Sequence, residues 1–335
     1  MLKKSLYVFT MYSRRLMSSK HSGGLDWKKQ EKLIMEPFEY IQKVPCKHVR
    51  MMATIFNPWL QAPEEKVQYV TEITDALTTW NILLDDIEDN SSFRYGVPAA
   101  HCIFGVALTI NAANKVLFQT YNKIAEMGYP LGIPIFIKQI EDYLNGHGVE
   151  LYWKDKCIYS TEKAHMEILR KKCGLFFVLP VELLQLFSSS KTDYTELAIN
   201  IGTYYFMLDD YYNLFHPKAL SRFTTAKQEN HTTCSDITDG KMTLAIIHAS
   251  QFPDVAPELA DILKQRTRDP NLVNRAMSLL KKHGSDEYTR DKLRTLEHDI
   301  RNEIARLGGN PTLTAFMDDL SFQTHEREPE HSLYS

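Results

Sequence analysis

Two clusters of aspartates lie at the ends of two apolar helical segments, and metal binding is the chemistry that they suggest. The first cluster is Asp85, Asp86 and Asp89, and the second is Asp209 and Asp210. On a helix, Asp85 and Asp89 would lie on one face about 6 Å apart, where two carboxylates repel each other unless a cation lies between them. Oxygen ligands with no His or Cys nearby suit Mg²⁺ bound to a substrate phosphate. A single cluster could be a solvated helix end, but its repetition favours a two-sided clamp for a diphosphate.

The helices that carry these aspartates are predicted by the spacing of apolar residues. Before the first cluster, apolar side chains recur every three or four residues, which is the period of one buried helix face: Val70, Ile73, Leu77, Trp80 and Leu84. A similar stripe leads into the second cluster: Ile201, Tyr205, Leu208, Tyr212 and Phe215. If these two helices face each other, both clusters can surround one diphosphate.

Composition indicates a single all-α globular domain. The chain has 335 residues, of which 44% are hydrophobic and 24% are charged, enough to bury a large core. Helical segments follow one another from Trp27 onward, with breaks at Pro and Gly and without the alternating pattern of strands. We expect the domain to span residues 26–322, between a basic N-terminal tail or transit peptide at residues 1–25 and a polar C-terminal tail at residues 323–335.

Charge and hydropathy also limit the partners and the compartment. A net charge of −3 without a basic stripe gives no reason to expect nucleic-acid binding. The longest apolar run, residues 174–187, is too short for stable membrane insertion. Five cysteines without a paired spacing favour a reducing, cytoplasmic location. A mitochondrial location is the alternative, because the N-terminus is basic and has no acid before Asp26.

Further segments along the chain match the motifs of one enzyme family. They are residues 45–50, Arg94 with Gly96, residues 146–153, Lys171 with residues 174–176, and residues 236–241, 287–290 and 308–311. On these segments and the aspartate clusters, the chain resembles the short-chain trans-isoprenyl diphosphate synthases, most closely the animal geranylgeranyl diphosphate synthases. The resemblance runs from about Pro37 to about Leu320. It implies an isoprenoid synthase helical bundle around a central cavity, usually as a homodimer.

The resemblance also implies roles for individual residues. Asp85 and Asp89 would hold two Mg²⁺ ions and Asp209 a third, with Asp86 and Asp210 completing the catalytic acids. Basic residues would bind the substrates' diphosphates: Arg94, Lys171 and Lys241 that of the allylic substrate, and Lys47 and Arg50 that of isopentenyl diphosphate. The implied chemistry is ionisation, in which metals and cations stabilise the leaving diphosphate and an allylic carbocation remains.

Departures from the family pattern are concentrated on the isopentenyl diphosphate side. Cys46 replaces a glycine, Thr78 replaces a histidine, and Tyr95 replaces an arginine. Because each charge-assisted hydrogen bond to phosphate is worth about 1.5–3 kcal/mol, losing two of them weakens such a site by more than about a hundredfold. His147 and Glu150 also depart from the pattern, in a neighbouring motif. The residues implied in ionisation are all retained.

An enzyme that forms the cation but binds the extender poorly must end the reaction by losing a proton, capturing water or cyclising. The combination resembles insect terpene synthases derived from this family. We therefore interpret the chain as a Mg²⁺-dependent terpene synthase that converts geranyl diphosphate to an acyclic monoterpene such as β-ocimene. One alternative is a prenyltransferase with an altered isopentenyl site. A second is a non-catalytic partner subunit of such a synthase.

Three residues are predicted to shape the hydrocarbon cavity: Trp80, Asn81 and Phe206. Trp80 lies five residues before Asp85, about 7.5 Å further along the helix, where the resemblance places the floor of the tail pocket. An indole there would shorten the pocket and favour the ten-carbon substrate, although Trp80 could instead point into the bundle core. Phe206 replaces a family glutamine and could offer its ring face to a carbocation, or it could be plain core packing.

Overall fold

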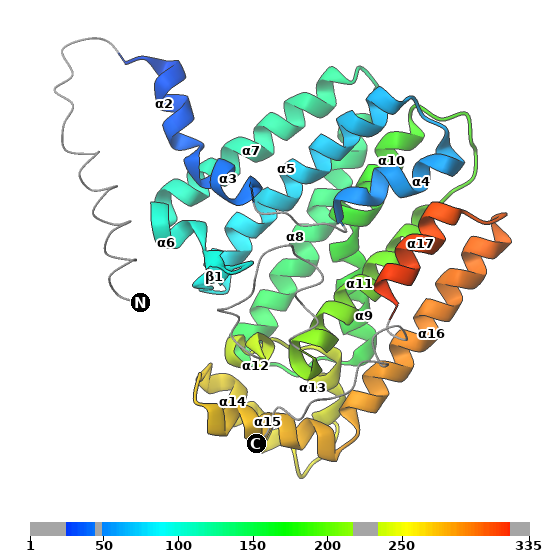
Figure 1. Cartoon of the computed structure of the whole chain (residues 1–335). Coiled ribbons are helices and arrows are strands. Elements are labelled where there is room, and N and C mark those ends of the chain that lie inside the picture. The colour runs from blue at the N-terminus through cyan, green and yellow to red at the C-terminus, as the bar shows by residue number, and fades with distance from the viewer. Residues whose placement is uncertain (1–24, 44–48, 217–233, 322–335) are drawn as a thin grey trace.

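A computed structural model describes residues 25–43, 49–216 and 234–321, and in these ranges the chain is a bundle of helices (Figure 1). The only strands in these ranges are β1 (Phe93–Arg94) and β2 (Val97–Pro98), which form one short hairpin. This confirms the all-α prediction. The helices are α2 (Trp27–Ile34), α3 (Glu36–Gln42), the 3-10 helix η1 (Val49–Met51), α4 (Met52–Leu60), α5 (Glu64–Glu88), α6 (Ala100–Phe104), α7 (Val106–Glu126), α8 (Gly132–Lys156), α9 (Glu162–Cys173), the π-helix η2 (Gly174–Val178), α10 (Leu179–Gln185), α11 (Thr195–Phe215), α12 (Ser235–Asp239), α13 (Leu244–Ala249), α14 (Ala256–Gln265), α15 (Pro270–Lys282), α16 (Ser285–Arg306) and α17 (Pro311–Leu320).

Several predictions about the ends of the chain fall outside the described ranges. These are most of the N-terminal tail (1–25), the C-terminal tail (323–335), and Cys46 and Lys47. The domain bounds of 26–322 stay a prediction. Within the described ranges, no helix combines the length and the apolar character needed to cross a membrane.

Helix α5 is central, because α3, α4, α7 and α10 all pack against it. The predicted apolar stripe is buried: Val70, Ile73 and Leu77 have no exposed surface. At the end of the stripe, Leu84 is only half-buried, whereas its neighbour Leu83 is fully buried. Burial thus extends beyond a single stripe, as expected for a helix with neighbours on several sides.

Helix α11 is buried on nearly every side, and a glycine permits its closest contact. Tyr204 and Tyr211 are among the largest fully buried side chains. A Cβ atom at Gly202 would lie 2.7 Å from Cys173 Sγ and 2.7 Å from Phe177 Cδ2, closer than side chains pack. Glycine at this position therefore lets α11 approach the end of α9.

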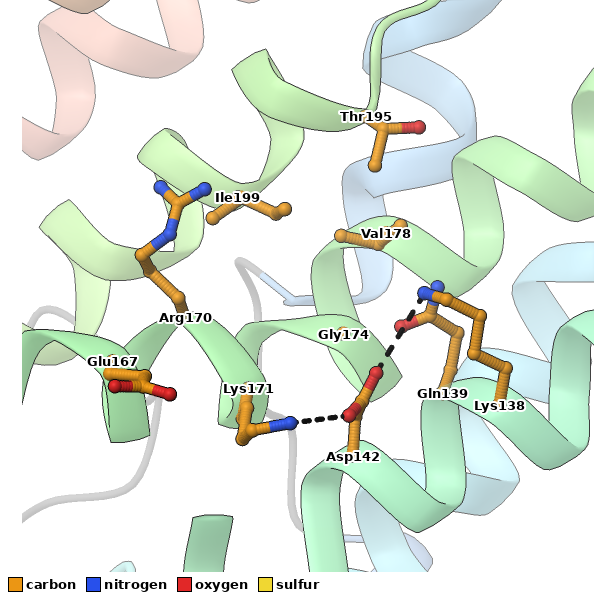
Figure 2. A pocket seen from close by; sticks show the side chains of 10 residues that line it. All are labelled: Lys138, Gln139, Asp142, Glu167, Arg170, Lys171, Gly174, Val178, Thr195 and Ile199. Atoms are coloured by element: carbon orange, nitrogen blue, oxygen red, sulfur yellow. Dashed lines mark hydrogen bonds and ion pairs between the residues drawn. The ribbon is translucent and has the colours of Figure 1, made fainter. Parts of the chain in front are cut away.

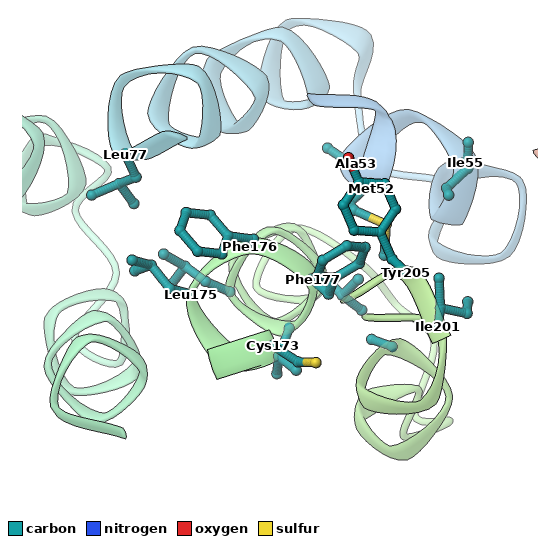
Figure 3. Close-up of a cluster of buried hydrophobic side chains, with 14 of the residues drawn as sticks. Met52, Ala53, Ile55, Leu77, Cys173, Leu175, Phe176, Phe177, Ile201 and Tyr205 are labelled. Atoms are coloured by element: carbon teal, nitrogen blue, oxygen red, sulfur yellow. The ribbon is translucent and has the colours of Figure 1, made fainter. Parts of the chain in front are cut away.

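The π-helix η2 fills the space between α5 and α11. Its five residues, Gly174–Val178, are all buried. Figure 3 shows Phe176 pointing toward Leu77 of α5 and Phe177 lying beside Tyr205 of α11. The ring centroids of Phe177 and Tyr205 are 5.5 Å apart. The segment therefore packs between α5 and α11, the two helices that carry the acid clusters.

Both acid clusters lie near one end of the bundle. The hairpin of β1 and β2 follows α5, and α12 packs against α11. Figure 1 shows β1 and α12 at the same end, next to the layer of α14 and α15. A second apolar cluster, which includes Ile237, Leu259 and Leu280, supports this layer.

Candidate active site

The first acid cluster is held at the end of α5 by Arg94. Asp85 and Asp86 lie in the last turn of α5. In the hairpin that follows, Tyr95 and Gly96 have φ values of 50° and 80°, as a tight two-residue turn requires. The turn lets β2 pair with β1, the strand that carries Arg94. Arg94 Nη2 lies 2.7 Å from Asp85 Oδ2, and Arg94 Nε lies 2.7 Å from Asp86 Oδ1.

Asp89 and its neighbour Glu88 bind a polar stripe on α8. Lys154 Nζ lies 2.5 Å from Asp89 Oδ1, and Lys154 is buried. About two turns earlier on the same face of α8, His147 Nε2 lies 2.8 Å from Glu88 Oε2. Glu150 lies between these two α8 residues and is also in contact with His147, at 3.5 Å from its Nδ1 atom. Helix α8 thus presents charged groups to the C-terminal end of α5.

The second acid cluster is held by Lys241. Asp209 and Asp210 lie near the end of α11. Lys241 Nζ lies 2.6 Å from Asp210 Oδ1. Gly240, with φ of 73°, ends α12 in the left-handed conformation, and the Lys241 amide then donates to the Asp236 carbonyl at 2.8 Å. This helix end turns the lysine toward α11.

The charges of the two clusters act on each other, so the clusters form one site. Burial raises the pKa of Asp209 to about 6, and the charge of Asp85 on the opposite helix adds to the rise. Burial and Asp85 raise the pKa of Asp89, while Lys241 from the second cluster opposes that rise. Each cluster therefore lies within electrostatic range of the other, as the two stripes predicted.

The residues of this site fit Mg²⁺ by their chemistry. Burial raises the pKa of Asp86 to about 6, and one buried carboxylate oxygen on each of Asp86 and Asp236 has no hydrogen-bond partner. Such oxygens are suitable ligands for a hard cation. In the described part of the chain, no group of three or more His, Cys, Asp or Glu side chains is arranged to hold a metal ion. Arg94, Lys154 and Lys241 hold the carboxylates instead, so a metal must exchange with them.

Two adjacent lysines near the end of α9 point in different directions, and the predicted one lies away from the acids. Lys171 Nζ lies 2.6 Å from Asp142 Oδ1. Figure 2 shows this pair in a pocket whose lining includes none of the aspartates of the two clusters. Lys172 bonds instead to Glu150, and its Nζ atom lies 5.5 Å from the centroid of the Phe206 ring. The structure therefore places Lys171 apart from the two acid clusters and turns Lys172 toward Glu150.

The residues predicted on the isopentenyl diphosphate side are engaged elsewhere or uncharged. Arg50 Nε lies 3.2 Å from Asp75 Oδ1. Thr78 donates its hydroxyl to the Thr74 carbonyl at 2.8 Å, within its own helix. Tyr95 carries no positive charge. Of these three predicted positions, only Arg50 carries a positive charge, and it is paired with Asp75.

The three residues predicted to shape the cavity, Trp80, Asn81 and Phe206, all contact aromatic side chains. Trp80 is 3% exposed and belongs to the main core, with its ring edge-to-face on Tyr143 at 6.0 Å. The Tyr143 hydroxyl donates to the Asn81 side chain. Phe206 is half-buried and packs edge-to-face on Phe177 at 5.9 Å. Trp80 thus lies in the core, which was the alternative interpretation, and its effect on substrate length stays a prediction.

Sequence reasoning assigned no role to several charged residues that the structure brings to the site: His147, Glu150, Lys154, Lys172, Asp236 and Asp239. A signal was present for three of them, because residues 147, 150 and 154 share one face of a helix. Asp236 and Asp239 lie in the motif that contains Lys241. Lys172 had no such signal, since spacing alone does not say which of two adjacent lysines faces inward.

Comparisons with known proteins agree with this geometry. The family model described as polyprenyl synthetase matches residues 31–280. A terpene synthase from Matsumurasca onukii is 40% identical over 301 residues, covering 90% of this chain and 96% of that protein. A geranylgeranyl pyrophosphate synthase from Dictyostelium discoideum is 36% identical over 288 residues, covering 86% and 92% of the two chains. One from Penicillium canescens is 35% identical over 287 residues, covering 85% and 84%.

Proposed function

Because the chain belongs to the polyprenyl synthetase family, we propose that it is a Mg²⁺-dependent terpene synthase that ionises geranyl diphosphate and releases an acyclic monoterpene such as β-ocimene. The observation that carries the proposal is an asymmetry in the site. Arg94 and Lys241 bond to carboxylates of the two acid clusters, where they could also bind a diphosphate held by metal ions. On the other side, Thr78 donates its hydroxyl within its own helix and Tyr95 carries no positive charge, so two of the predicted phosphate contacts are missing. The relative named a terpene synthase supports the same conclusion.

Substrate binding requires an exchange of ionic partners. In the structure, Arg94 holds Asp85 and Asp86, and Lys241 holds Asp210. Asp85, Asp89 and Asp209 would hold Mg²⁺, which when bound supplies positive charge to stabilise the leaving diphosphate. Arg94 and Lys241 would then donate charge-assisted hydrogen bonds to phosphate oxygens instead of carboxylates.

The chemical step breaks the bond between carbon and the diphosphate oxygen, and both electrons leave with the oxygen. The allylic carbocation that remains is delocalised, and the face of the Phe206 ring can stabilise it. The cation then loses a proton from carbon to give an acyclic triene, and the released diphosphate accepts that proton. Residues that bind the diphosphate therefore act twice. They stabilise it as the leaving group, and they hold it in place as the base that accepts the proton.

Product analysis tests the proposal. The purified chain would be incubated with geranyl diphosphate and Mg²⁺, with and without isopentenyl diphosphate, and the products separated by gas chromatography. We expect a ten-carbon hydrocarbon in both mixtures, at similar rates. The variant Thr78→His/Tyr95→Arg restores two predicted phosphate contacts, so it should divert substrate to longer diphosphates. Efficient elongation by the unaltered chain would refute the proposal.

A prenyltransferase is the second candidate function. Arg50 retains its charge on the predicted isopentenyl side, and two of the relatives are named geranylgeranyl pyrophosphate synthases. If Arg50 leaves Asp75 when isopentenyl diphosphate binds, condensation remains feasible. The same product analysis separates the two functions, since this candidate requires elongated diphosphates as the main product.

We also propose that the chain forms a homodimer. The supporting observation is a set of large apolar side chains exposed on α7 and α8, two helices that pack against each other: Val106, Ile110, Phe118, Tyr121, Leu144 and Tyr152. Such exposure is typical of a protein interface. Sedimentation velocity should show a dimer, and Phe118→Lys should shift it toward the monomer. A monomeric unaltered chain at micromolar concentration would refute this proposal.

A further inference from the structure

Lys172 is linked to the end of α5 by a chain of contacts between charged side chains. Its ammonium group bonds to Glu150, and Glu150 Oε2 lies 3.5 Å from His147 Nδ1. His147 Nε2 in turn lies 2.8 Å from Oε2 of Glu88, the neighbour of Asp89. Lys172 therefore faces the end of α5 that carries the first acid cluster.

Lys172 is held in the site by contacts on two sides. Its ammonium group bonds to Glu150, and only 11% of the Lys172 side chain and 12% of the Glu150 side chain are exposed. On the other side, its Nζ atom lies 5.5 Å from the centroid of the Phe206 ring. In such a buried setting an ion pair is screened less than at the surface. The ammonium group thus lies between the polar site and the aromatic wall.

Lys171 has a different setting. Its side chain is 39% exposed and pairs with Asp142, which also lies 3.7 Å from Lys138 Nζ. These three residues line the pocket of Figure 2, together with Glu167 and Arg170. Because adjacent side chains on a helix point about 100° apart, α9 directs Lys171 to Asp142 and Lys172 to Glu150.

We propose that Lys172, and not Lys171, binds the diphosphate of the allylic substrate. This deepens the function proposed above and rests on it for the identity of the substrate. When a phosphate oxygen takes the place of Glu150 as its partner, the ammonium group moves off the face of Phe206. The ring face is then available to the allylic carbocation. Lys172 would thereby connect diphosphate binding to the preparation of the hydrocarbon side of the site.

The test compares the two lysines by the binding of inorganic diphosphate. Calorimetry would measure its affinity for the full chain in Mg²⁺, for the unaltered protein, Lys172→Gln, Lys172→Arg and Lys171→Gln. Loss of one charge-assisted contact should weaken binding about 10- to 100-fold in Lys172→Gln. Lys172→Arg should recover most of this loss, and Lys171→Gln should change the affinity less than about twofold.

Lys172→Gln leaves the buried Glu150 without its partner, so a second variant guards against a purely structural effect. In Lys172→Gln/Glu150→Gln both charges are removed together, and circular dichroism should show native helix content. We expect this variant to bind diphosphate as weakly as Lys172→Gln. Unweakened binding in the folded double variant, or a larger loss in Lys171→Gln, would overturn the proposal. Failure of the proposed function is seen separately, as elongated products from the unaltered chain.

Discussion

The stability of the folded protein should depend on pH through His147. Its imidazole is buried, with Nε2 2.8 Å from Glu88 Oε2 and Nδ1 3.5 Å from Glu150 Oε2. Burial alone would lower its pKa, but the nearby carboxylates of Glu150 and Glu88 raise the pKa of His147 to about 9. The perturbation that removes this effect is His147→Gln, which keeps a hydrogen-bonding side chain of similar reach but cannot be protonated.

The sign follows from the direction of the pKa change. In the unfolded chain the pKa of a histidine is about 6.5, so the folded state binds this proton more tightly. The stabilisation is therefore fully present below pH 6.5 and is lost as the pH rises through about 9. Because a tenfold change in proton affinity corresponds to about 1.4 kcal/mol, the contribution is about 3 kcal/mol.

Urea unfolding followed by circular dichroism, with a chelator present, would measure this contribution at pH 6 and pH 9.5. Between these values the free energy of unfolding of the unaltered chain should fall by about 3 kcal/mol more than that of His147→Gln. His298→Gln, at an exposed position, is the matched control and should keep the pH dependence. Parallel pH profiles for the unaltered chain and His147→Gln would refute the reasoning.

Three further changes test the site and its support. Asp85→Ala should reduce diphosphate release from geranyl diphosphate at least about 100-fold with helix content unchanged; near-normal release would remove the case for a metal platform. Gly202→Ala should lower the free energy of unfolding by about 1–3 kcal/mol, because its Cβ would meet Cys173 Sγ at 2.7 Å, whereas Gly148→Ala, with nothing within 4 Å, should not. Trp80→Ala should cost about 3–5 kcal/mol of stability and shift substrate preference toward fifteen carbons; an unaltered preference would place the indole outside the tail pocket.

The parts of the fold that follow from hydrophobic period were predictable. Burial of Val70, Ile73 and Leu77 follows directly from their spacing. The π-helix was not predicted, because the segment reads only as an apolar run. Pro180, in the first turn of α10, was a signal: proline has no amide hydrogen and cannot continue the regular hydrogen-bond ladder. In the structure the Leu179 amide bonds to the Gly174 carbonyl.

The sequence predicted which acidic side chains would lie together, but it predicted fewer of the basic side chains that contact them. The positions of Asp85 and Asp209 on facing helices follow from two apolar stripes, and Arg94 lies at the site as the motif indicated. Lys154 and Lys172 were missed, because their roles depend on how α8 and α9 are rotated against each other. Rotation is set by close packing, such as Gly146 against the Cβ atom of Lys171, and no spacing rule in one helix reports it.

The central claim is that the chain retains the groups that ionise an allylic diphosphate but has lost firm binding of isopentenyl diphosphate. The most direct measurement is calorimetric titration of isopentenyl diphosphate, in Mg²⁺, into the unaltered chain and into Thr78→His/Tyr95→Arg. We predict that the unaltered chain binds it at least about 100-fold more weakly than the double variant, as expected for two missing phosphate contacts. Equal and tight binding by both proteins would contradict the account.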